Sequence, residues 1–350
     1  MNLGTVRATT LINGRLKKSL GLVPESKKIC YNTNEHRQRR FNMFKIVNGG
    51  TIKRNPTWTG IIFGSPKSGK STLAASASNP ILIDLDKGAY RIAGKDRTGL
   101  DIVECDKWDD LVALVAAPEL KQYKTIIVDT FGAAVDMIIR DKFSNVMNPA
   151  KWGAVKSEIM SVCNQLKMTG RSVLFLAHES EEKNDDKIIK RPQCQGKAKE
   201  ELMKMLDFIG HTTKNGTDFV LEFGGDDSIY VGNTFNFANR YVLPDVRTEP
   251  NTFFKDVIEK QIADFLEQDE KANAALIGAM DAVREKIKAC KTAGDFTHTA
   301  TQIATTAGLT AGAALKLKHE LIEAADAAGF VYDRTAAGFV AKTADEPKAE

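Results

Sequence analysis

The sequence predicts an α/β protein in which helices flank a mainly parallel sheet, with a small helical module towards the C-terminus. Short apolar runs of strand length alternate along the chain with longer stretches of helical periodicity, as expected for β-α-β units. These runs are continuously apolar, which is typical of strands covered on both faces. Several of them end in acidic or polar residues, at the sheet edge where open α/β sheets bind ligands.

Length and composition fit one large domain and a smaller one. The chain has 350 residues, of which 43% are apolar and 27% charged, ordinary values for a globular protein. No apolar run approaches the roughly 18 residues of a membrane span, and the N-terminus lacks the apolar core of a signal peptide. We therefore expect a cytoplasmic protein without a membrane partner. Five cysteines without a Cys-x-x-Cys pair suggest neither a disulfide framework nor a zinc site.

Charge and periodicity divide the chain further. The first 42 residues carry nine basic and two acidic residues, a net charge of +7, whereas the rest of the chain carries −3. They show no sustained periodicity, so we expect a disordered basic extension, with Met43 as an alternative start. Such an arm is also compatible with contact to nucleic acid. The expected parts are the extension 1–42, an α/β domain 43–250, a helical module 251–342 and a tail 343–350.

The strongest motif, from Gly60 to Thr72, reads G-I-I-F-G-S-P-K-S-G-K-S-T. It fits the phosphate-loop pattern of a glycine, four free positions and then Gly-Lys-Ser/Thr, and an apolar run leads into it. The loop must wrap its backbone N–H groups round a triphosphate, and two positions need glycine because a Cβ would obstruct the turn. A chance match is expected in about one in a hundred chains of this length. We therefore expect ATP to bind here, at Gly64, Ser65, Pro66, Lys67, Ser68, Gly69, Lys70, Ser71 and Thr72.

Two residues of this motif have further roles. Lys70 is placed to reach the β- and γ-phosphates, and the Ser71 hydroxyl is placed to ligate Mg²⁺.

A second nucleotide signature, T-I-I-V-D-T at 125–130, has the Walker B form of apolar residues followed by Asp129. Alone it is weak, because buried strands often end in aspartate. After a phosphate loop it indicates a carboxylate that holds the water shell of Mg²⁺.

Two other predicted strands end in polar residues. The run 81–86 ends in two acids, Asp84 and Asp86. Because side chains alternate along a strand, these two should point the same way. The run 172–177 is followed by His178. A polar residue at that position can sense a γ-phosphate, although a lone histidine is more often structural.

The segment 180–199 is expected to be a mobile loop, because it is highly charged, has little apolar content and contains Pro192 and Gly196. A solvated charge run is the ordinary explanation. Its position directly after the strand that ends in His178 favours contact with a polyanion instead. The candidate DNA-binding residues are Lys187, Lys190, Arg191 and Lys197.

The remaining elements follow from periodicity and capping residues. Within the α/β domain we expect helices at 70–77, 131–143, 149–168 and 202–209, with a further helix capped by Asp106. We also expect a short strand at 101–105 and an antiparallel pair of 218–223 with 228–231. Further on we expect an amphipathic helix at 253–266, a helical stripe ending at Ile287, a helix capped by Thr310 and a hairpin at 330–340.

In this order the motifs resemble the RecA-like ATPase core. More closely, they are similar to phage-encoded RecA-like ATP-binding proteins that act as single-strand annealing recombinases. The resemblance spans about residues 61–245 and rests on I-I-F-G-S-P-K-S-G-K-S-T, L-I-D-L-D-K-G, T-I-I-V-D-T, L-A-H-E and K-R-P-x-x-x-G-K-A. It implies assembly as a ring or filament on single-stranded DNA, with ATP between subunits, in the host-cell cytoplasm. A single-strand-binding protein is a further implied partner.

The resemblance also implies residue roles. Asp86 stands where RecA proteins carry the glutamate that activates the attacking water, and its side chain is one methylene shorter. His178 stands where they carry the glutamine that relays the γ-phosphate state to the adjacent DNA-binding loop. With Lys70 and Asp129, these two residues form the expected catalytic set.

The leading hypothesis is an ATP- and single-stranded-DNA-binding recombination protein that promotes pairing of complementary strands and acts as a DNA-dependent ATPase. A replicative helicase or helicase loader on the same core is the first alternative, and it should show strand displacement with strongly DNA-stimulated turnover. The second is a nucleotide-gated interaction module without hydrolysis. ATPase rates with and without single-stranded DNA distinguish these alternatives.

Overall fold

The computed structural model of the protein describes residues 49, 52–145, 151–184, 187–194, 198–225 and 227–342. The expected extension at 1–42, the expected tail at 343–350 and the candidate residue Lys197 lie outside the described residues. The expected start of a helix at Pro149 also lies outside them.

The described core is a ten-stranded sheet with the main order β10-β8-β7-β1-β5-β4-β2-β3. Its central strands are all parallel, as expected from the alternation of strands and helices. These are β7 (Phe208–Asn215), β1 (Thr59–Gly64), β5 (Ser172–Asn184), β4 (Thr125–Asp129), β2 (Pro80–Asp84) and β3 (Asp101–Glu104). The antiparallel strands are β8 (Asp218–Glu222) and β10 (Arg240–Val242) beyond β7, β6 (Lys187–Pro192) on β5, and β9 (Gly232–Asn233) on β7.

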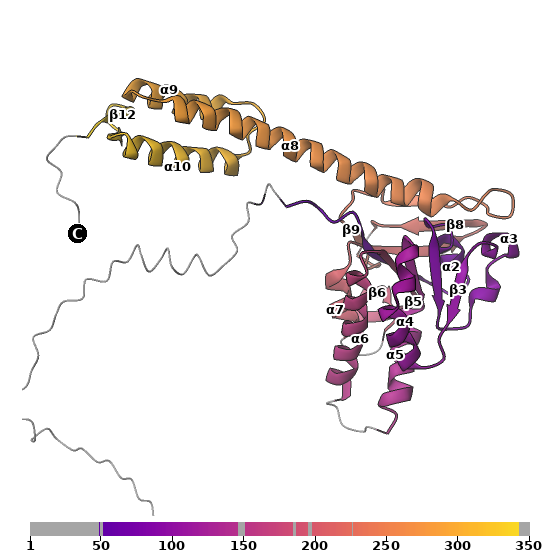
Figure 1. Cartoon of the computed structure of the whole chain (residues 1–350). Coiled ribbons are helices and arrows are strands. Elements are labelled where there is room, and N and C mark those ends of the chain that lie inside the picture. Colours follow the sequence, from indigo (N-terminus) through magenta and orange to yellow (C-terminus); the bar gives the residue numbers. More distant parts are fainter. Residues whose placement is uncertain are drawn as a thin grey trace, which may run out of the picture. The chain divides into compact units, whose positions relative to one another are not determined.

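Helices cover both faces of this sheet (Figure 1). Successive side chains of a strand point to opposite faces. Ile61 and Phe63 of β1 therefore join one buried hydrophobic cluster, whereas Ile62 joins another. The first cluster contains side chains of α4 (Trp108–Ala116), α5 (Phe131–Lys142), α6 (Lys151–Met168) and α7 (Ala198–Met205), and the second contains those of α2 (Lys70–Ala74). The predicted fold class, a RecA-like P-loop core with helices on both sides of a mainly parallel sheet, is confirmed.

Short helical segments complete the connections. They are η2 (Ala89–Arg91), α3 (Gly94–Arg97) and η3 (Pro118–Gln122). Thr130 caps α5, because its side chain accepts a hydrogen bond from the Ala133 N–H.

The prediction of a loop at 180–199 is wrong. β5 continues to Asn184 and pairs with β6 as an antiparallel hairpin, in which Glu179 lies opposite Pro192 and Glu181 lies opposite Lys190. On its other edge, β6 is held by the segment after β8, since the Lys190 N–H donates to the Ser228 carbonyl at 2.7 Å. Backbone pairing on both sides stabilises this strand although half of its side chains are charged. The last part of the expected loop forms the first turn of α7.

Two predictions that follow this hairpin are also wrong. The expected helix at 202–209 overlaps the end of α7, and its last residues, from Phe208 onwards, begin β7. Parallel pairing with β1 in the middle of the sheet overrides the weak helical pattern. The expected pairing of 218–223 with 228–231 does not occur, because β8 pairs with β7 and with β10. Ile229 instead forms a parallel bridge with Lys190.

The C-terminal part forms a third hydrophobic cluster. Its helices are α8 (Lys260–Ala289), α9 (Ala293–Thr305) and α10 (Ala311–Ala327), and a hairpin of β11 (Phe330–Asp333) with β12 (Gly338–Ala341) packs with them. The Thr310 cap and the hairpin confirm the predictions. α9 was not predicted, although Thr292 and Asp295 form a capping box at its start.

The segment η4 (Phe254–Glu259) has π-helical hydrogen bonds and leads into α8, within the expected amphipathic helix at 253–266. Phe254 and Ile262 belong to the second cluster, whereas Val283 and Ile287 near the other end of α8 belong to the third. A single helix therefore contributes to two separate hydrophobic clusters.

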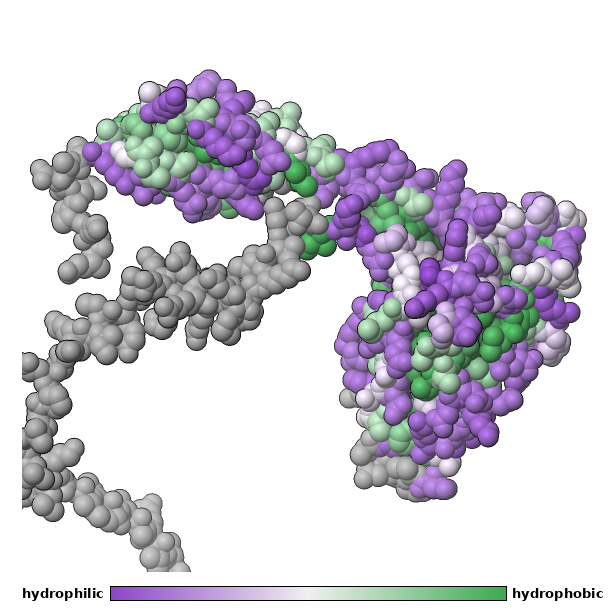
Figure 2. All heavy atoms as spheres, in the orientation of Figure 1, coloured by the Kyte–Doolittle hydropathy of each residue, from purple (hydrophilic) through white to green (hydrophobic). Residues whose placement is uncertain are grey.

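Most of the surface visible in Figure 2 is hydrophilic, with smaller hydrophobic groups among the polar side chains. Leu315, Ile322 and Val331 of the C-terminal module are among the exposed large apolar side chains. None of the helices in the described part of the chain is long and apolar enough to span a bilayer.

Candidate nucleotide site

The predicted phosphate loop connects β1 to α2, with Lys70 at the first position of the helix. Lys70 is 6% exposed, and its Nζ donates to the carbonyl oxygens of Gly64 at 2.9 Å and Ser65 at 2.8 Å. Burial lowers the pKa of Lys70, and the carboxylates of Asp129, Glu179 and Asp86 partly offset that effect. The ammonium therefore lies inside the curve of the loop, within the electrostatic reach of three acidic groups.

The two glycines of the motif have separate structural reasons. A Cβ on Gly64 would lie 2.1 Å from the backbone oxygen of Thr212 in β7, so any side chain there would collide with the neighbouring strand. Gly69 caps α2 with a φ of 88°, a conformation that favours glycine. Thr212 also meets the loop through a 2.8 Å hydrogen bond between its hydroxyl and that of Ser68. Among the remaining loop residues, Pro66 and Lys67 are exposed.

Ser71 and Asp129, the two expected residues of the metal site, are in contact. The Ser71 hydroxyl donates to Asp129 Oδ2 at 2.6 Å. Asp129 is 3% exposed, and its pKa is raised to about 6, mainly by burial and further by the negative charges of Asp86 and Asp84, against the hydrogen bond from Ser71. A buried carboxylate beside a hydroxyl and other acids fits a site that receives a hard divalent cation with its water shell.

The two acids at the end of β2 have different environments. Asp84 is buried and accepts backbone hydrogen bonds from Gly88 and Ala89, both at 2.9 Å, so it caps the turn that leads into η2. Asp86 lies beyond the strand, and its Oδ2 is 3.8 Å from Nε2 of His178. The neighbouring His178 is the main reason that the pKa of Asp86 is lowered. Asp86 Oδ1 is buried without a hydrogen-bond partner among the described residues, which leaves an ionised oxygen available to a ligand or water.

A network that sequence analysis missed joins the phosphate loop to β7. The Ser65 hydroxyl donates to Glu179 Oε1 at 2.6 Å, and Glu179 Oε2 is 2.9 Å from Nε2 of the buried His211. Burial alone would raise the pKa of Glu179, but the hydrogen bonds from Ser65 and His211, with the charge of Lys190, lower it overall. His211 was missed because β7 was not predicted. The sequence signal for a strand here was the pair Thr212 and Thr213 directly after His211, because β-branched residues favour strands.

The structure brings only one of the expected DNA-binding residues close to this network. Lys190 Nζ is 3.7 Å from Glu179 Oε1. Lys187 instead pairs with Asp227 at 3.1 Å, and Arg191 pairs with Glu182 at 3.5 Å. Lys197 lies outside the described residues.

Together these features define a P-loop NTPase domain. They are the strand, the phosphate loop, the short helix after it, the buried Asp129 and the polar residues at the neighbouring strand ends. The observations fit a nucleoside triphosphate with Mg²⁺: a loop that requires glycine at two positions, a buried lysine inside its curve, and a carboxylate close to that lysine with one oxygen unpartnered among the described residues.

The chain belongs to the AAA domain family, whose model matches residues 57–241, more than half of its length. Among solved structures, a crystal structure of the RadB recombinase is similar over 47% of this chain and 79% of its own, with 14% sequence identity and a TM-score of 0.33. These values are too low to transfer the role of RadB to this chain. No curated protein matches the chain.

Proposed function

We propose that the protein is an ATP-binding recombination protein that binds single-stranded DNA, promotes pairing of complementary strands and hydrolyses ATP when DNA is bound. The observation that carries this proposal is the continuity of β5. One strand passes the phosphate loop at His178 and Glu179 and continues into the hairpin that carries Lys187, Lys190 and Arg191.

The contacts of Glu179 supply a route from nucleotide to DNA. Glu179 is hydrogen-bonded to Ser65 of the phosphate loop and ion-paired with Lys190 of the hairpin. A γ-phosphate bound in the loop adds negative charge beside Glu179 and competes for Ser65. Since Ser65 and Lys190 both respond to that charge, the position of Lys190 depends on the bound nucleotide.

The residues of the loop have separate roles towards ATP and Mg²⁺. When bound, Mg²⁺ would supply charge neutralisation to the phosphates. Lys70 contributes a cation inside the cradle, and Ser71 and Asp129 would hold the metal with its water shell. The loop N–H groups orient the phosphates.

Asp86 is the proposed general base. Its low pKa keeps it ionised, and one of its oxygens is free of hydrogen bonds among the described residues. Glu179 suits this role less well, because Ser65 and His211 already occupy its oxygens. His178 lies beside Asp86 and orients it.

A salt titration of DNA binding tests the proposal. Changing Lys187 and Lys190 together to alanine should weaken binding of single-stranded DNA and flatten the slope of log K against log salt by roughly one to one and a half units, since each single-strand phosphate contact contributes about 0.7. ATP affinity without DNA should be nearly unchanged. As a control, Lys107→Ala with Lys121→Ala removes two exposed charges elsewhere in the domain and should leave the slope as it was.

If the double variant keeps the wild-type slope, the hairpin does not bind DNA. The same preparations give the ATPase rate with and without single-stranded DNA and the rate of annealing of complementary strands. An ATPase rate that does not change when DNA is added, or strand displacement in place of annealing, would contradict the proposed function.

A further inference from the structure

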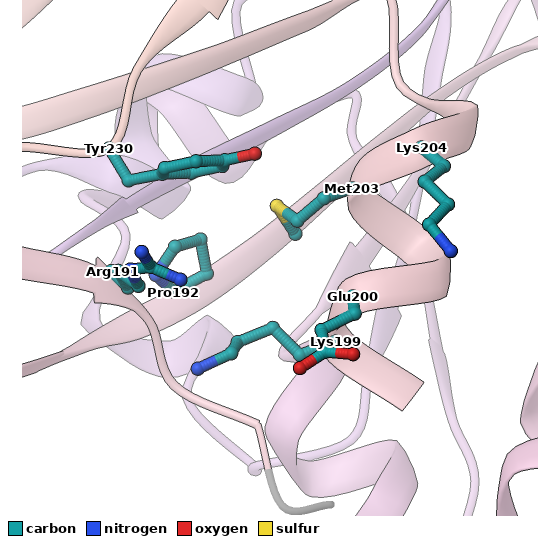
Figure 3. Close-up of a pocket in the computed structure, with 7 residues that line it drawn as sticks. All are labelled: Arg191, Pro192, Lys199, Glu200, Met203, Lys204 and Tyr230. Carbon is teal, nitrogen blue, oxygen red and sulfur yellow. The ribbon is translucent and has the colours of Figure 1, made fainter. Parts of the chain in front are cut away.

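A surface pocket of about 330 Å³ lies between β6, α7 and Tyr230 (Figure 3). The rings of Tyr230 and Pro192 and the side chain of Met203 form its apolar part. Its lining residues are Arg191 and Pro192 of β6, Lys199, Glu200, Met203 and Lys204 of α7, and Tyr230. No residue of the phosphate loop lines it, so this pocket is separate from the nucleotide site.

Tyr230 is exposed but held in place. Its backbone N–H donates to the Lys190 carbonyl at 2.9 Å, which ties the segment before β9 to the edge of β6. The guanidinium carbon of Arg191 is 4.9 Å from the centre of the tyrosine ring, within the range of a cation–π contact. The residue nevertheless remains 40% exposed. An exposed aromatic ring with an anchored backbone and a guanidinium packed against it is a stacking platform, because little conformational freedom is lost when a second ring packs on it.

The charge around the platform favours an anion. Three cations, Arg191, Lys199 and Lys204, line the pocket with one carboxylate, Glu200, and Lys204 pairs with Glu201 at 3.3 Å. Arg191 and Lys199 both pair with Glu182, which keeps their cationic groups near each other. A phosphate that approaches the pocket therefore meets two positioned cations whose present partner it can replace.

We propose that this pocket accepts one nucleobase of a DNA single strand, stacked on Tyr230 and against Met203, with the flanking phosphates at Arg191 and Lys199. The inference rests on the proposed function, in which the adjoining hairpin tracks the strand through its phosphates. A duplex keeps its bases stacked, so only a single strand offers a free base to this pocket. Because every base has a π-face, the pocket has little sequence preference.

Binding of an oligothymidylate strand and of an abasic strand of equal length tests the inference. Tyr230→Ala should weaken oligothymidylate binding by roughly 5- to 150-fold, the range for loss of one stacked base, and leave abasic-strand binding unchanged. Tyr230→Phe retains the ring and should bind both strands like the wild type. The salt slope should be the same in all three proteins, since no phosphate contact is lost.

A matched control and a second measurement complete the test. Tyr332→Ala changes a tyrosine of similar exposure, 46%, in the C-terminal module and should bind both strands normally. A strand containing 5-iododeoxyuridine should form a photo-crosslink at Tyr230.

The inference is overturned if Tyr230→Ala keeps the wild-type preference for the base-containing strand, or if Tyr332→Ala loses it equally. In that outcome the wild type still binds DNA with its salt slope, so the proposed function stands. If the wild type binds neither strand, the proposed function fails, and the inference fails with it.

Discussion

Lys70 keeps its charge in a buried position by donating to two carbonyl oxygens of its own loop. Phosphate oxygens are stronger acceptors than carbonyls because they carry net charge, so a triphosphate can replace both contacts. Asp129 is the complementary group: a buried acid whose pKa is raised to about 6 and which a divalent cation would stabilise in its ionised form. The chemistry of the candidate site depends on these two buried charges.

Lys70→Ala is expected to abolish ATP binding, because it removes the side-chain cation inside the cradle. Isothermal titration with ATP and Mg²⁺ measures the loss. Lys67→Ala is the matched control, since Lys67 is an exposed lysine of the same loop and contributes only its backbone. ATP affinity that survives in the Lys70 variant would contradict the phosphate-loop assignment.

Asp129→Asn is expected to raise the free energy of unfolding at neutral pH, without added nucleotide or metal, by on the order of 3 kcal/mol. Burial raises the folded-state pKa of Asp129 from 3.8 to about 6. The folded protein thus holds the proton more tightly than the unfolded chain, and the stability that protonation contributes is lost as the pH rises through about 6.

Urea unfolding of both proteins across this pH range measures the effect. The advantage of Asp129→Asn should shrink as the pH falls and vanish near the unfolded-state pKa of 3.8. Asp110→Asn, at an exposed position, should differ little from the wild type. A difference between Asp129→Asn and wild type that is constant over the whole pH range would contradict the assigned pKa.

At the scale of elements, the β5–β6 hairpin and β7 bring together Glu179, Lys190 and His211, whose contacts were not predicted from the sequence. Glu179 lies where β5 passes the phosphate loop, and His211 reaches it from β7. The hairpin could not be predicted from its side chains, because they lack apolar alternation and its stability comes from backbone pairing on both edges of β6.

Glu179→Gln is expected to uncouple DNA binding from ATP. The amide retains the size of the side chain and can still accept from Ser65, but it loses the charge that pairs with Lys190 and that strengthens the hydrogen bond with His211. ATP should then no longer change the affinity for single-stranded DNA, whereas in the wild type we expect a change of roughly 5- to 150-fold. DNA titrations with and without a non-hydrolysable ATP analogue measure this coupling.

Glu181→Gln is the control for this prediction, because Glu181 is an exposed acid that lies opposite Lys190 in the hairpin. It should retain the wild-type effect of ATP. Equal coupling in the Glu179 variant and the wild type would show that the hairpin does not respond through Glu179.

At the scale of the whole molecule, the described residues form three hydrophobic clusters, two of them on the faces of the sheet and the third in the C-terminal helices. We predict from the sequence that residues 251–342 are a separate module. The three tryptophans of the chain, Trp58, Trp108 and Trp152, all precede it. Trp58 also contacts Phe254 of η4, with 5.5 Å between the ring centres. Tryptophan fluorescence therefore reports on the α/β domain and the η4 segment that packs on it, and not on the third cluster.

Leu317→Ala is expected to destabilise the C-terminal module alone. Leu317 is fully buried in the third cluster, and such a truncation costs about 2–5 kcal/mol. Urea unfolding followed by far-UV circular dichroism should show an earlier transition for part of the helical signal, whereas the tryptophan transition and ATP affinity should not move. Leu315→Ala, on the same helix but 58% exposed, is the control. A tryptophan transition that shifts with Leu317→Ala would show that the two parts unfold as one.

The sequence by itself determined the fold class, the phosphate loop, the pairing of Ser71 with Asp129 and the strand that carries His178, but not the continuation of that strand to Asn184. These depend on local patterns: a fixed glycine and lysine spacing, and apolar runs that end in polar residues. Only the tertiary structure decided which polar strand ends meet. Glu179 joins Ser65 to His211 and Lys190 because β5 lies between β1 and β4 and because β7 pairs with β1. Tyr230 meets Arg191 because a later segment pairs with β6. Such contacts arise from strand order and backbone pairing between distant segments, which no local pattern of side chains specifies.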